Sequence, residues 1–265
     1  MAEKNIHFEK ISLLVTHFNR SKSLERLLLK LKEIGISFHE IIVSDGGSEF
    51  DHLQYIEGLK KHTEFTLLTT PVNKGLGNSI NVGQDRATTP YILYIQEDFV
   101  PKHQIKTAIK DGFEIMENEK AWDIVRFYAF PWADYPYLKP YRNGFSEMKF
   151  HLAPWYTDHR KFFCYSDHPH LKRATFPQKF GRYFETLSGD ITEMKMCRSF
   201  LRNKGRGLYY EQHGELFEHQ NTQDEPGQVR LDKRKFQKLR NNPVARSLFL
   251  KYRMLKDTML LLMND

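Results

Sequence analysis

Cysteine is scarce in this chain. Cys164 and Cys197 are the two cysteines among 265 residues, too few for a disulfide framework in a chain of this length. A chain without disulfides is typical of a reducing compartment, so we expect a cytoplasmic protein. Cys164 stands near His168 and His170 at loose metal-ligand spacing. No fourth ligand is evident, so the sequence does not favour a zinc site there.

Long apolar runs are also lacking. No stretch approaches the roughly 20 apolar residues that span a bilayer. The first residues, Met1–Asn5, contain no apolar core of a signal peptide. We therefore expect a soluble protein that is at most peripheral, at the inner face of the membrane.

Two common nucleotide-binding motifs are missing. The sequence has no Gly-Lys-Ser/Thr phosphate loop. Gly75 and Gly77 resemble the start of a dinucleotide fingerprint, but Ile80 stands where its third glycine belongs. The pair also follows a third predicted strand rather than a first. Neither motif is therefore assigned.

Basic residues outnumber acidic ones. Lys and Arg number 40 against 33 Asp and Glu, which gives a formal charge of +7 and a pI near 9.2. This balance fits several anionic partners, namely nucleic acid, an anionic membrane or a phosphorylated small molecule, and it selects none of them. The length and the 40% hydrophobic content allow one large domain with an appendage.

Strand and helix patterns alternate through the first half of the chain. They occur at 11–15, 21–34, 40–43, 53–59, 65–69, 78–87, 91–95 and 105–116, beginning with a strand. This alternation predicts an α/β fold over residues 1–125, with a mostly parallel, Rossmann-like sheet flanked by helices.

The rest of the chain breaks this rhythm. Residues 126–226 are rich in aromatic residues and proline and predict an irregular half of the same domain, apart from a helix at 191–204 and strand-like pieces near Tyr209 and Phe217. Aromatic faces suit flat ligands such as sugar rings. Residues 227–265 interleave basic and apolar side chains, which predicts a basic, amphipathic helical tail.

Carboxylates follow two of the predicted strands. Glu97 and Asp98 end the fourth strand, and Asp45 ends the second, before Gly46. A carboxylate at the edge of a core is costly without a partner, so a cation or a polar ligand is indicated. The structural alternatives are a strand that runs out into solvent and an ordinary Asp-Gly turn.

Four short motifs occur in order along the first part of the chain: Val15–Arg20, Ile42–Ser48, Asn73–Gly77 and Gln96–Asp98. They resemble the Thr-x-x-Asn-Arg turn, the Asp-x-Gly-Ser signature, the Asn-x-Gly-x-Gly turn and the Asp-x-Asp metal motif of glycosyltransferase family 2. The resemblance covers about the first 100 residues well. It implies an inverting nucleotide-sugar transferase with the GT-A fold, active in polysaccharide or glycan biosynthesis.

The resemblance implies a site for the sugar donor. Thr16 and Asp45 would bind the nucleoside. Asp98 would hold Mg²⁺ or Mn²⁺, which neutralises the leaving diphosphate, and His219 is a candidate further metal ligand. The other residues implied in donor binding are Asn19, Arg20, Gly46, Asn73, Lys74, Gly75, Gln96 and Glu97.

Two positions depart from the family pattern. Gln96 replaces the first aspartate of the metal motif, so a metal-independent transferase is an alternative. Ile80 stands where many members carry arginine, which leaves the phosphate charge to Lys74 or to a basic residue of the aromatic-rich second half. A non-catalytic nucleotide-sugar-binding or scaffold protein of the same fold is a further alternative.

The resemblance also implies a general base at the start of a helix in the second half, which would deprotonate the acceptor hydroxyl for in-line attack. Counting back from Gly205 favours Glu193, which is the first choice. The helix start favours Asp190, which would also suit an N-cap. Glu185 is a third choice.

The tail carries a separate expectation. Basic and apolar residues interleave from Val229 to Arg240, and apolar residues dominate after Leu248. Such a helix is expected to lie on an anionic membrane surface, where a lipid-linked or glycan acceptor would be found. The tail contains no recognisable nucleic-acid motif, so nucleic acid is not an expected partner.

Overall fold

The computed structural model describes residues 5–129, 137–152, 159–220, 225 and 243–263. The first half contains β1 (Ile6–His17), α1 (Ser21–Ile34), β2 (Ile36–Asp45), α2 (Phe50–Leu59), β3 (Thr66–Thr69), α3 (Leu76–Arg86), β4 (Tyr91–Gln96), β5 (Phe99–Pro101) and α4 (Ile105–Asn118). The second half contains β6 (Ile124–Arg126), β7 (Tyr137–Pro140), β8 (Phe145–Lys149), η1 (His159–Phe163), β9 (His170–Arg173), α5 (Phe176–Phe180), α6 (Gly189–Arg202), β10 (Gly207–Tyr210), η2 (His213–Glu215), β11 (Phe217–His219) and α8 (Pro243–Leu262).

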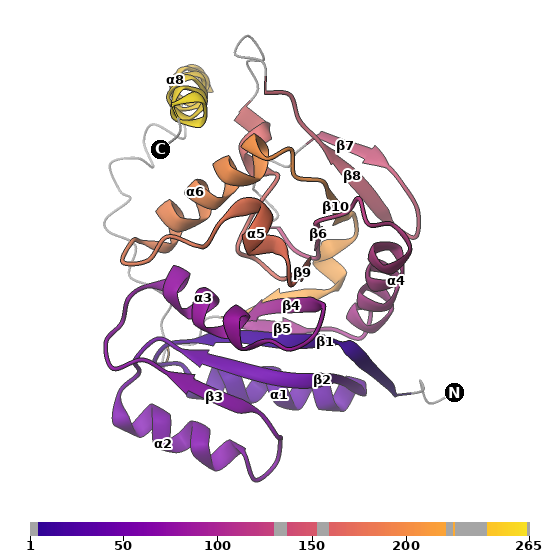
Figure 1. The fold of residues 1–265 in the computed structure, drawn as a ribbon, viewed down its shortest axis with the longest axis vertical. Helices are drawn as coiled ribbons and strands as arrows, with labels where there is room; N and C mark the ends of the chain where they lie inside the picture. The colour runs from indigo at the N-terminus through magenta and orange to yellow at the C-terminus, as the bar shows by residue number, and fades with distance from the viewer. Residues whose placement is uncertain (1–4, 130–136, 153–158, 221–224, 226–242, 264–265) are drawn as a thin grey trace.

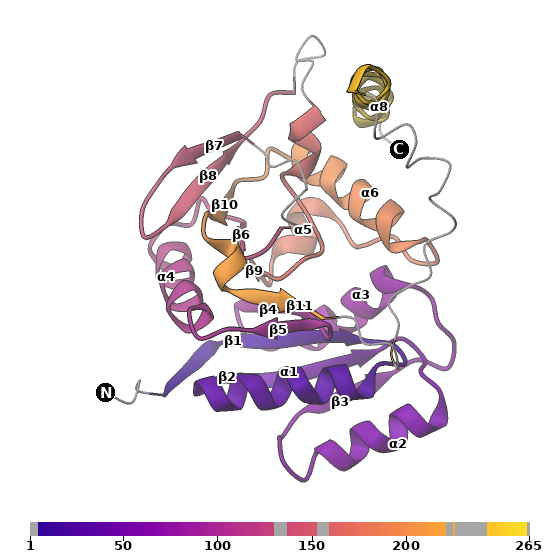
Figure 2. The ribbon, with the colours of Figure 1, turned by 180° about the vertical axis from the view of Figure 1, so that it is seen from behind.

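A nine-stranded sheet forms the centre of the molecule, in the order β3-β2-β1-β4-β9-β6-β10-β8-β7 (Figures 1 and 2). β3, β2, β1 and β4 are parallel neighbours, and β6 and β10 are parallel to each other. β9 is antiparallel to β4 and β6, and β8 is antiparallel to β10 and β7. Within this sheet β8 and β9 therefore run against the other strands, and the predicted mostly parallel α/β fold is confirmed.

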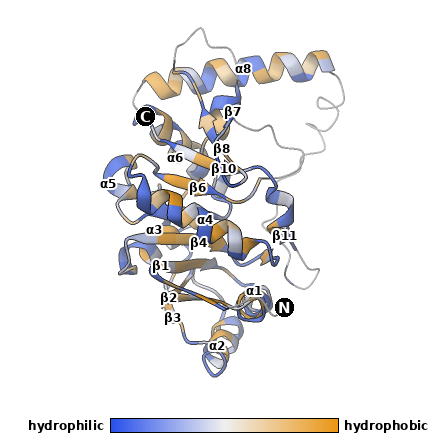
Figure 3. Ribbon diagram, turned by 90° about the vertical axis from the view of Figure 1, so that its right-hand side faces the viewer, coloured by the Kyte–Doolittle hydropathy of each residue, from blue (hydrophilic) through white to orange (hydrophobic). Residues whose placement is uncertain are grey.

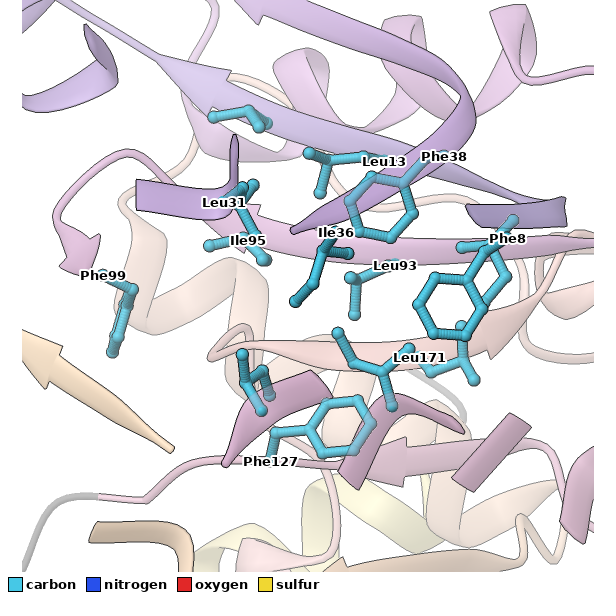
Figure 4. Packing of buried hydrophobic residues seen from close by; sticks show 14 of the residues in the cluster. Phe8, Leu13, Leu31, Ile36, Phe38, Leu93, Ile95, Phe99, Phe127 and Leu171 are labelled. Atoms are coloured by element: carbon cyan, nitrogen blue, oxygen red, sulfur yellow. The ribbon is translucent and has the colours of Figure 1, made fainter. Parts of the chain in front are cut away.

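Helices cover both faces of the sheet. Alternate residues of a strand point to opposite faces, so Leu13 and Leu14 of β1 enter different cores. Leu13 belongs to the core under α1 and α4, together with Leu31 and Leu171 (Figure 4). Leu14 belongs to the core under α3, α5 and α6, together with Phe200. The sheet is thus buried on both faces, so a ligand can reach it only at its edges.

Both ends of α1 are fixed by identifiable groups. The helix ends at Gly35, whose φ of 74° lies in the left-handed region that glycine tolerates. At the other end the carboxylate of Glu225 accepts hydrogen bonds from the backbone N–H groups of Lys22 (2.8 Å) and Ser23 (2.9 Å). A residue from far along the chain therefore satisfies N–H groups that a helix leaves free at its start.

The second half adds strands that the sequence did not predict, namely β6 to β9, whereas β10 and β11 confirm the strand-like pieces predicted near Tyr209 and Phe217. β6 to β10 continue the central sheet, and β6, which spans the expected boundary at residue 125, pairs with β9 and β10. These strands are three to five residues long, and several of their buried side chains are polar, including Arg126, His170 and Lys172. Short strands with buried polar residues escape a search for apolar runs. The aromatic residues Trp132 and Trp155 lie outside the described residues.

The predicted tail helix is present as α8. It lies at the opposite end of the molecule from α2 (Figures 1 and 3). The basic run from Val229 to Arg240 lies outside the described residues. Among the helices that are described, none combines the length and the apolar character needed to cross a membrane.

Candidate active site

The turns that follow β1, β2 and β4 meet at one edge of the sheet. His17 of β1 is aligned with Asp45 of β2, and Thr16 of β1 with Gln96 of β4. Because the three strands are parallel, the motifs at their carboxyl ends converge, as they do at the ligand sites of open α/β sheets. The turn before α3 and the start of α6 complete this edge.

Asp45 organises the turn after β2. Its side chain is fully buried and accepts hydrogen bonds from the backbone N–H groups of Gly47 and Ser48 (2.9 Å each), the Thr69 hydroxyl (2.9 Å), His17 Nδ1 (2.8 Å) and the Ser48 hydroxyl. Burial alone would raise the pKa of Asp45, but these hydrogen bonds, with those from His17 and Ser48 foremost, lower it to about 2.

The turn after β1 is tied to the same carboxylate. The backbone N–H of Arg20 donates to His17 Nε2 (3.0 Å), so Nδ1 carries the ring hydrogen that is donated to Asp45. Asn19, with a φ of 52°, donates its backbone N–H to the Ser48 hydroxyl (2.8 Å). Thr16 is buried and hydrogen-bonded to the Tyr94 hydroxyl (3.1 Å). Asp45 therefore holds the turns after β1 and β2 together, and direct contact of Asp45 or Thr16 with a base stays a prediction.

Replacing Asp45 with asparagine is expected to lower the free energy of unfolding by about 2 kcal/mol at neutral pH, the amount that its lowered pKa represents. The folded pKa lies below the ordinary value. The stabilisation is therefore complete above the unfolded pKa of about 4 and is lost as the pH falls through about 2. Urea denaturation at neutral pH and at pH values descending below about 4 measures this difference.

Asp85→Asn is the matched control for Asp45→Asn, because Asp85 is exposed and pairs with Arg182 on the surface (2.7 Å). Its effect on stability is expected to stay below about 0.5 kcal/mol. Equal effects of the two substitutions would contradict the role given to Asp45.

Glycines allow neighbouring turns to approach this edge closely. Gly47 has a φ of 84°, and a Cβ there would stand 2.8 Å from the carbonyl oxygen of Thr70. Gly75 has a φ of 82°, and a Cβ there would stand 2.8 Å from the carbonyl oxygen of Leu187. A side chain at either position would be strained and would collide with backbone. Gly46 donates its N–H to the carbonyl oxygen of His17 (2.8 Å) and so joins the turns after β1 and β2.

The turn before α3 presents a lysine. Asn73 accepts a hydrogen bond from the backbone N–H of Gly75 (2.7 Å), and the carbonyl oxygen of Lys74 accepts one from Thr186 (2.7 Å). The backbone of the turn is therefore fixed, while the side chain of Lys74 is exposed. This lysine is available to an anionic ligand.

A charged cluster surrounds Asp98. Its Oδ2 accepts hydrogen bonds from Arg20 Nη1 (2.9 Å) and His219 Nε2 (3.0 Å), and Glu97 Oε1 lies 3.4 Å from the same Arg20 nitrogen. Asp98, Glu97 and Arg20 are all buried. Burial would raise the pKa of Asp98, but His219 and Arg20 lower it. Burial and the neighbouring Asp98 raise the pKa of Glu97 to about 8.

Strand pairing brings His219 to this cluster. β11 pairs with β5, which places His219 opposite Phe99, and the backbone N–H of Gln220 donates to the carbonyl oxygen of Asp98 (2.9 Å). The two residues predicted as metal ligands are thus neighbours, although 121 positions separate them.

The groups around Asp98 suit a divalent cation in part. Asp98 Oδ1 is buried and has no hydrogen-bond partner within the described chain, and carboxylate oxygens are preferred ligands of Mg²⁺. Gln96 takes another role, since its side-chain amide donates to the carbonyl oxygen of Asp167 (3.3 Å). Within the described residues, no group of three or more His, Cys, Asp and Glu side chains is arranged to hold a metal. A cation here would therefore need further ligands, which diphosphate oxygens can supply.

A carboxyl pair, Asp167 and Glu193, lies next to this cluster, and Asp167 was not predicted from the sequence. Asp167 is hydrogen-bonded to Glu193, and both lie near Asp190. Burial first, and then the neighbouring carboxylates, raise the pKa of Asp167 to about 6 and that of Glu193 well above its usual range. Asp167 lies just before β9. Because the sequence did not predict β9, it gave no sign that Asp167 lies at the edge of the sheet.

The three candidate bases have different surroundings. Asp190 is exposed on the first turn of α6. Glu193 is half-buried and paired with Asp167. Glu185 accepts hydrogen bonds from Asn78 (2.9 Å) and Asn81 (3.0 Å) of α3. Glu185 therefore holds α3 against the second half of the chain, and Asp190 is the most accessible of the three carboxylates.

Part of this chain is similar in sequence to known proteins. Residues 12–178, more than half of the chain, match the family model for Glycosyl transferase family 2. Poly-beta-1,6-N-acetyl-D-glucosamine synthase of Staphylococcus epidermidis is 28% identical over 92 residues, which are 35% of this chain and 22% of the synthase. The synthase of Staphylococcus aureus strain COL is 25% identical over 92 residues, with the same coverage. The chain thus spans about a fifth of the length of these relatives.

Solved structures share its fold. S. aureus TarS 1–349 in complex with UDP-GlcNAc has a TM-score of 0.59 and 14% identity, over 94% of this chain and 71% of that one. A second TarS structure has a TM-score of 0.58 and 17% identity, over 78% of this chain and 36% of that one. These likenesses confirm the predicted GT-A fold. Together with the match over residues 12–178, they show that the chain belongs to glycosyl transferase family 2, a family of glycosyltransferases.

Proposed function

We propose that this chain transfers a sugar from a nucleoside-diphosphate sugar to an acceptor hydroxyl with inversion. One observation carries the proposal: the Asp45 turn, the Asp98 cluster and the carboxyl groups at the start of α6 meet at one edge of a glycosyltransferase sheet. TarS structures contain UDP-GlcNAc and UDP, which supports a uridine nucleotide. The similarity to poly-beta-1,6-N-acetyl-D-glucosamine synthases supports a role in polysaccharide biosynthesis.

The sugar donor would bind across the turns after β1 and β2. The turns that Asp45 holds together would receive the nucleoside, against Thr16, Asn19 and Gly46. Two basic side chains would face the diphosphate. Arg20 lies beside Asp98, and Lys74 is exposed on the turn before α3. They would supply the positive charge that Ile80 does not. A guanidinium is permanently charged and suits phosphate oxygens.

A divalent cation would be held by His219 and by Asp98, whose Oδ1 has no hydrogen-bond partner among the described residues. When bound, Mg²⁺ or Mn²⁺ stabilises the negative charge that develops on a leaving diphosphate. Arg20 would stabilise the same charge. Its hydrogen bond to Asp98 would keep the guanidinium and the cation site next to the diphosphate.

Asp190 would act as the general base. An inverting transfer needs a carboxylate that accepts the proton of the acceptor hydroxyl during attack. Asp190 is exposed to an incoming acceptor. Burial and the neighbouring Asp167 raise the pKa of Glu193, which favours its protonated form, and a carboxyl group that already holds a proton does not accept another. The pair of Glu193 and Asp167 would instead position the start of α6 and the acceptor.

Release of nucleoside diphosphate from a panel of nucleotide sugars, with Mn²⁺ and a mixed glycan acceptor pool, tests the proposal. We expect a uridine-diphosphate sugar to be turned over faster than its guanosine counterpart. Tight nucleotide binding by calorimetry without turnover of any sugar would instead favour the alternative of a non-catalytic nucleotide-sugar-binding protein. Full activity in the presence of a chelator would favour the metal-independent transferase.

A further inference from the structure

α8 presents an apolar stripe to solvent. Leu248, Tyr252, Leu255, Met259 and Leu262 are each between 56% and 63% exposed. They recur at spacings of four and three residues, so they lie along one face of the helix. Contiguous apolar side chains on a surface mark an interaction site.

The opposite face of α8 fixes the helix to the domain. Its buried residues are Met254, Asp257, Thr258 and Leu261. Arg198 of α6 forms an ion pair with Asp257 (2.8 Å). Arg202 of α6 donates a hydrogen bond to the carbonyl oxygen of Leu261 (2.9 Å). The stripe therefore faces away from the protein, at one end of the molecule (Figure 3).

The exposed surface of α8 is positively charged. Lys251 and Lys256 flank the stripe, and Arg246 and Arg253 lie further round the helix, all exposed. Asp257, the one acidic residue within Pro243–Leu262, is buried and neutralised by an ion pair. An apolar stripe between basic flanks is the pattern of a helix that lies in a membrane interface.

We propose that α8 lies on an anionic membrane surface, with the Leu248–Leu262 stripe among the acyl chains and Lys251 and Lys256 on the anionic headgroups. The proposal depends on the faces of α8 and not on the transfer reaction. It assigns membrane contact to this stripe, which is separate from the basic run that ends at Arg240.

A second copy of the chain fits the stripe less well. If Tyr252 is taken as position a of a heptad, Leu255 falls at d, Lys256 at e and Lys251 at g. In a helix pair the e and g side chains of the two copies face each other across the seam. Here they would place lysine against lysine, and the exposed part of α8 holds no acidic residue to pair with them. Anionic lipid satisfies the same lysines.

Flotation of the full-length protein with vesicles tests the proposal. We expect the protein to float with phosphatidylcholine vesicles that contain phosphatidylserine and to remain at the bottom with phosphatidylcholine alone. Leu255→Glu is expected to weaken binding at least about tenfold, because inserting one leucine contributes roughly that factor. The double variant Lys251→Ala/Lys256→Ala is expected to lose most of the preference for phosphatidylserine.

Leu29→Glu is the matched control, because Leu29 is an exposed leucine on α1; it is expected to float like the wild type. Circular dichroism of each variant checks the fold. Wild-type protein that does not float, or Leu255→Glu protein that floats as well as the wild type, would overturn the proposal. A wild-type dimer in sedimentation that Leu255→Glu dissociates, without flotation of either, would also overturn it and assign the stripe to a second copy.

Discussion

Asp190→Asn is expected to lower kcat by roughly 10²–10⁴-fold, the usual contribution of a general base. Asparagine keeps the size of the side chain but cannot accept the proton of an acceptor hydroxyl. The KM for the nucleotide sugar is expected to change by less than about twofold, because the lost interaction exists only in the transition state. Steady-state release of nucleoside diphosphate with saturating acceptor measures both constants.

Glu193→Gln is the informative control for Asp190→Asn. The pKa of Glu193 is raised by burial and by Asp167, which favours the protonated form that glutamine imitates. We expect a loss in kcat below about tenfold. A severe loss in Glu193→Gln with a mild one in Asp190→Asn would reverse the assignment and make Glu193 the base. Calorimetry of nucleotide binding to both variants separates lost chemistry from lost folding.

The sequence predicted the parts of the fold that local patterns determine. β4 and the carboxyl-terminal parts of β1 and β2 are apolar runs that are buried on both faces, and each ends where a polar motif begins. Parallel strands bring their carboxyl ends together, so the meeting of Asp45 with the turn after β1 followed from the order of elements. The neighbouring positions of Asp98 and His219 followed from the family resemblance alone, because no local pattern pairs β5 with β11.

The sequence did not predict features that depend on distant partners. β9 carries the buried residues His170 and Lys172, and Lys172 is satisfied by Gln84 (3.0 Å) and the Tyr183 hydroxyl (3.0 Å). A buried strand with such polar side chains looks like an exposed segment in the sequence, because the partners that make its burial possible lie far away in the chain. Asp167 was missed for the same reason, since it precedes β9. Glu225 was also missed, because its role is to bind the start of a helix some 200 residues earlier.

Asp98→Asn is expected to lower kcat/KM by roughly 10²–10³-fold, the factor that a few kcal/mol of lost charge stabilisation represents. The substituted asparagine would keep one oxygen but would carry no charge, so it would bind both a divalent cation and Arg20 less well. The concentration of Mn²⁺ needed for half-maximal rate is expected to rise in the variant. Titration of activity with Mn²⁺ after chelation measures this shift.

The two mechanisms for neutralising the diphosphate give different patterns of loss. If Asp98 and His219 hold a cation, wild-type activity disappears with a chelator and returns with Mn²⁺, and His219→Ala shifts the Mn²⁺ dependence in the same direction as Asp98→Asn. If Arg20 and Lys74 carry the charge alone, chelation has no effect and Lys74→Ala causes the larger loss. In that case Asp98 serves to hold Arg20 (2.9 Å) in place, and Arg20→Lys would reproduce the defect of Asp98→Asn because an ammonium does not match the guanidinium geometry. Full turnover by Asp98→Asn would exclude both roles for this carboxylate.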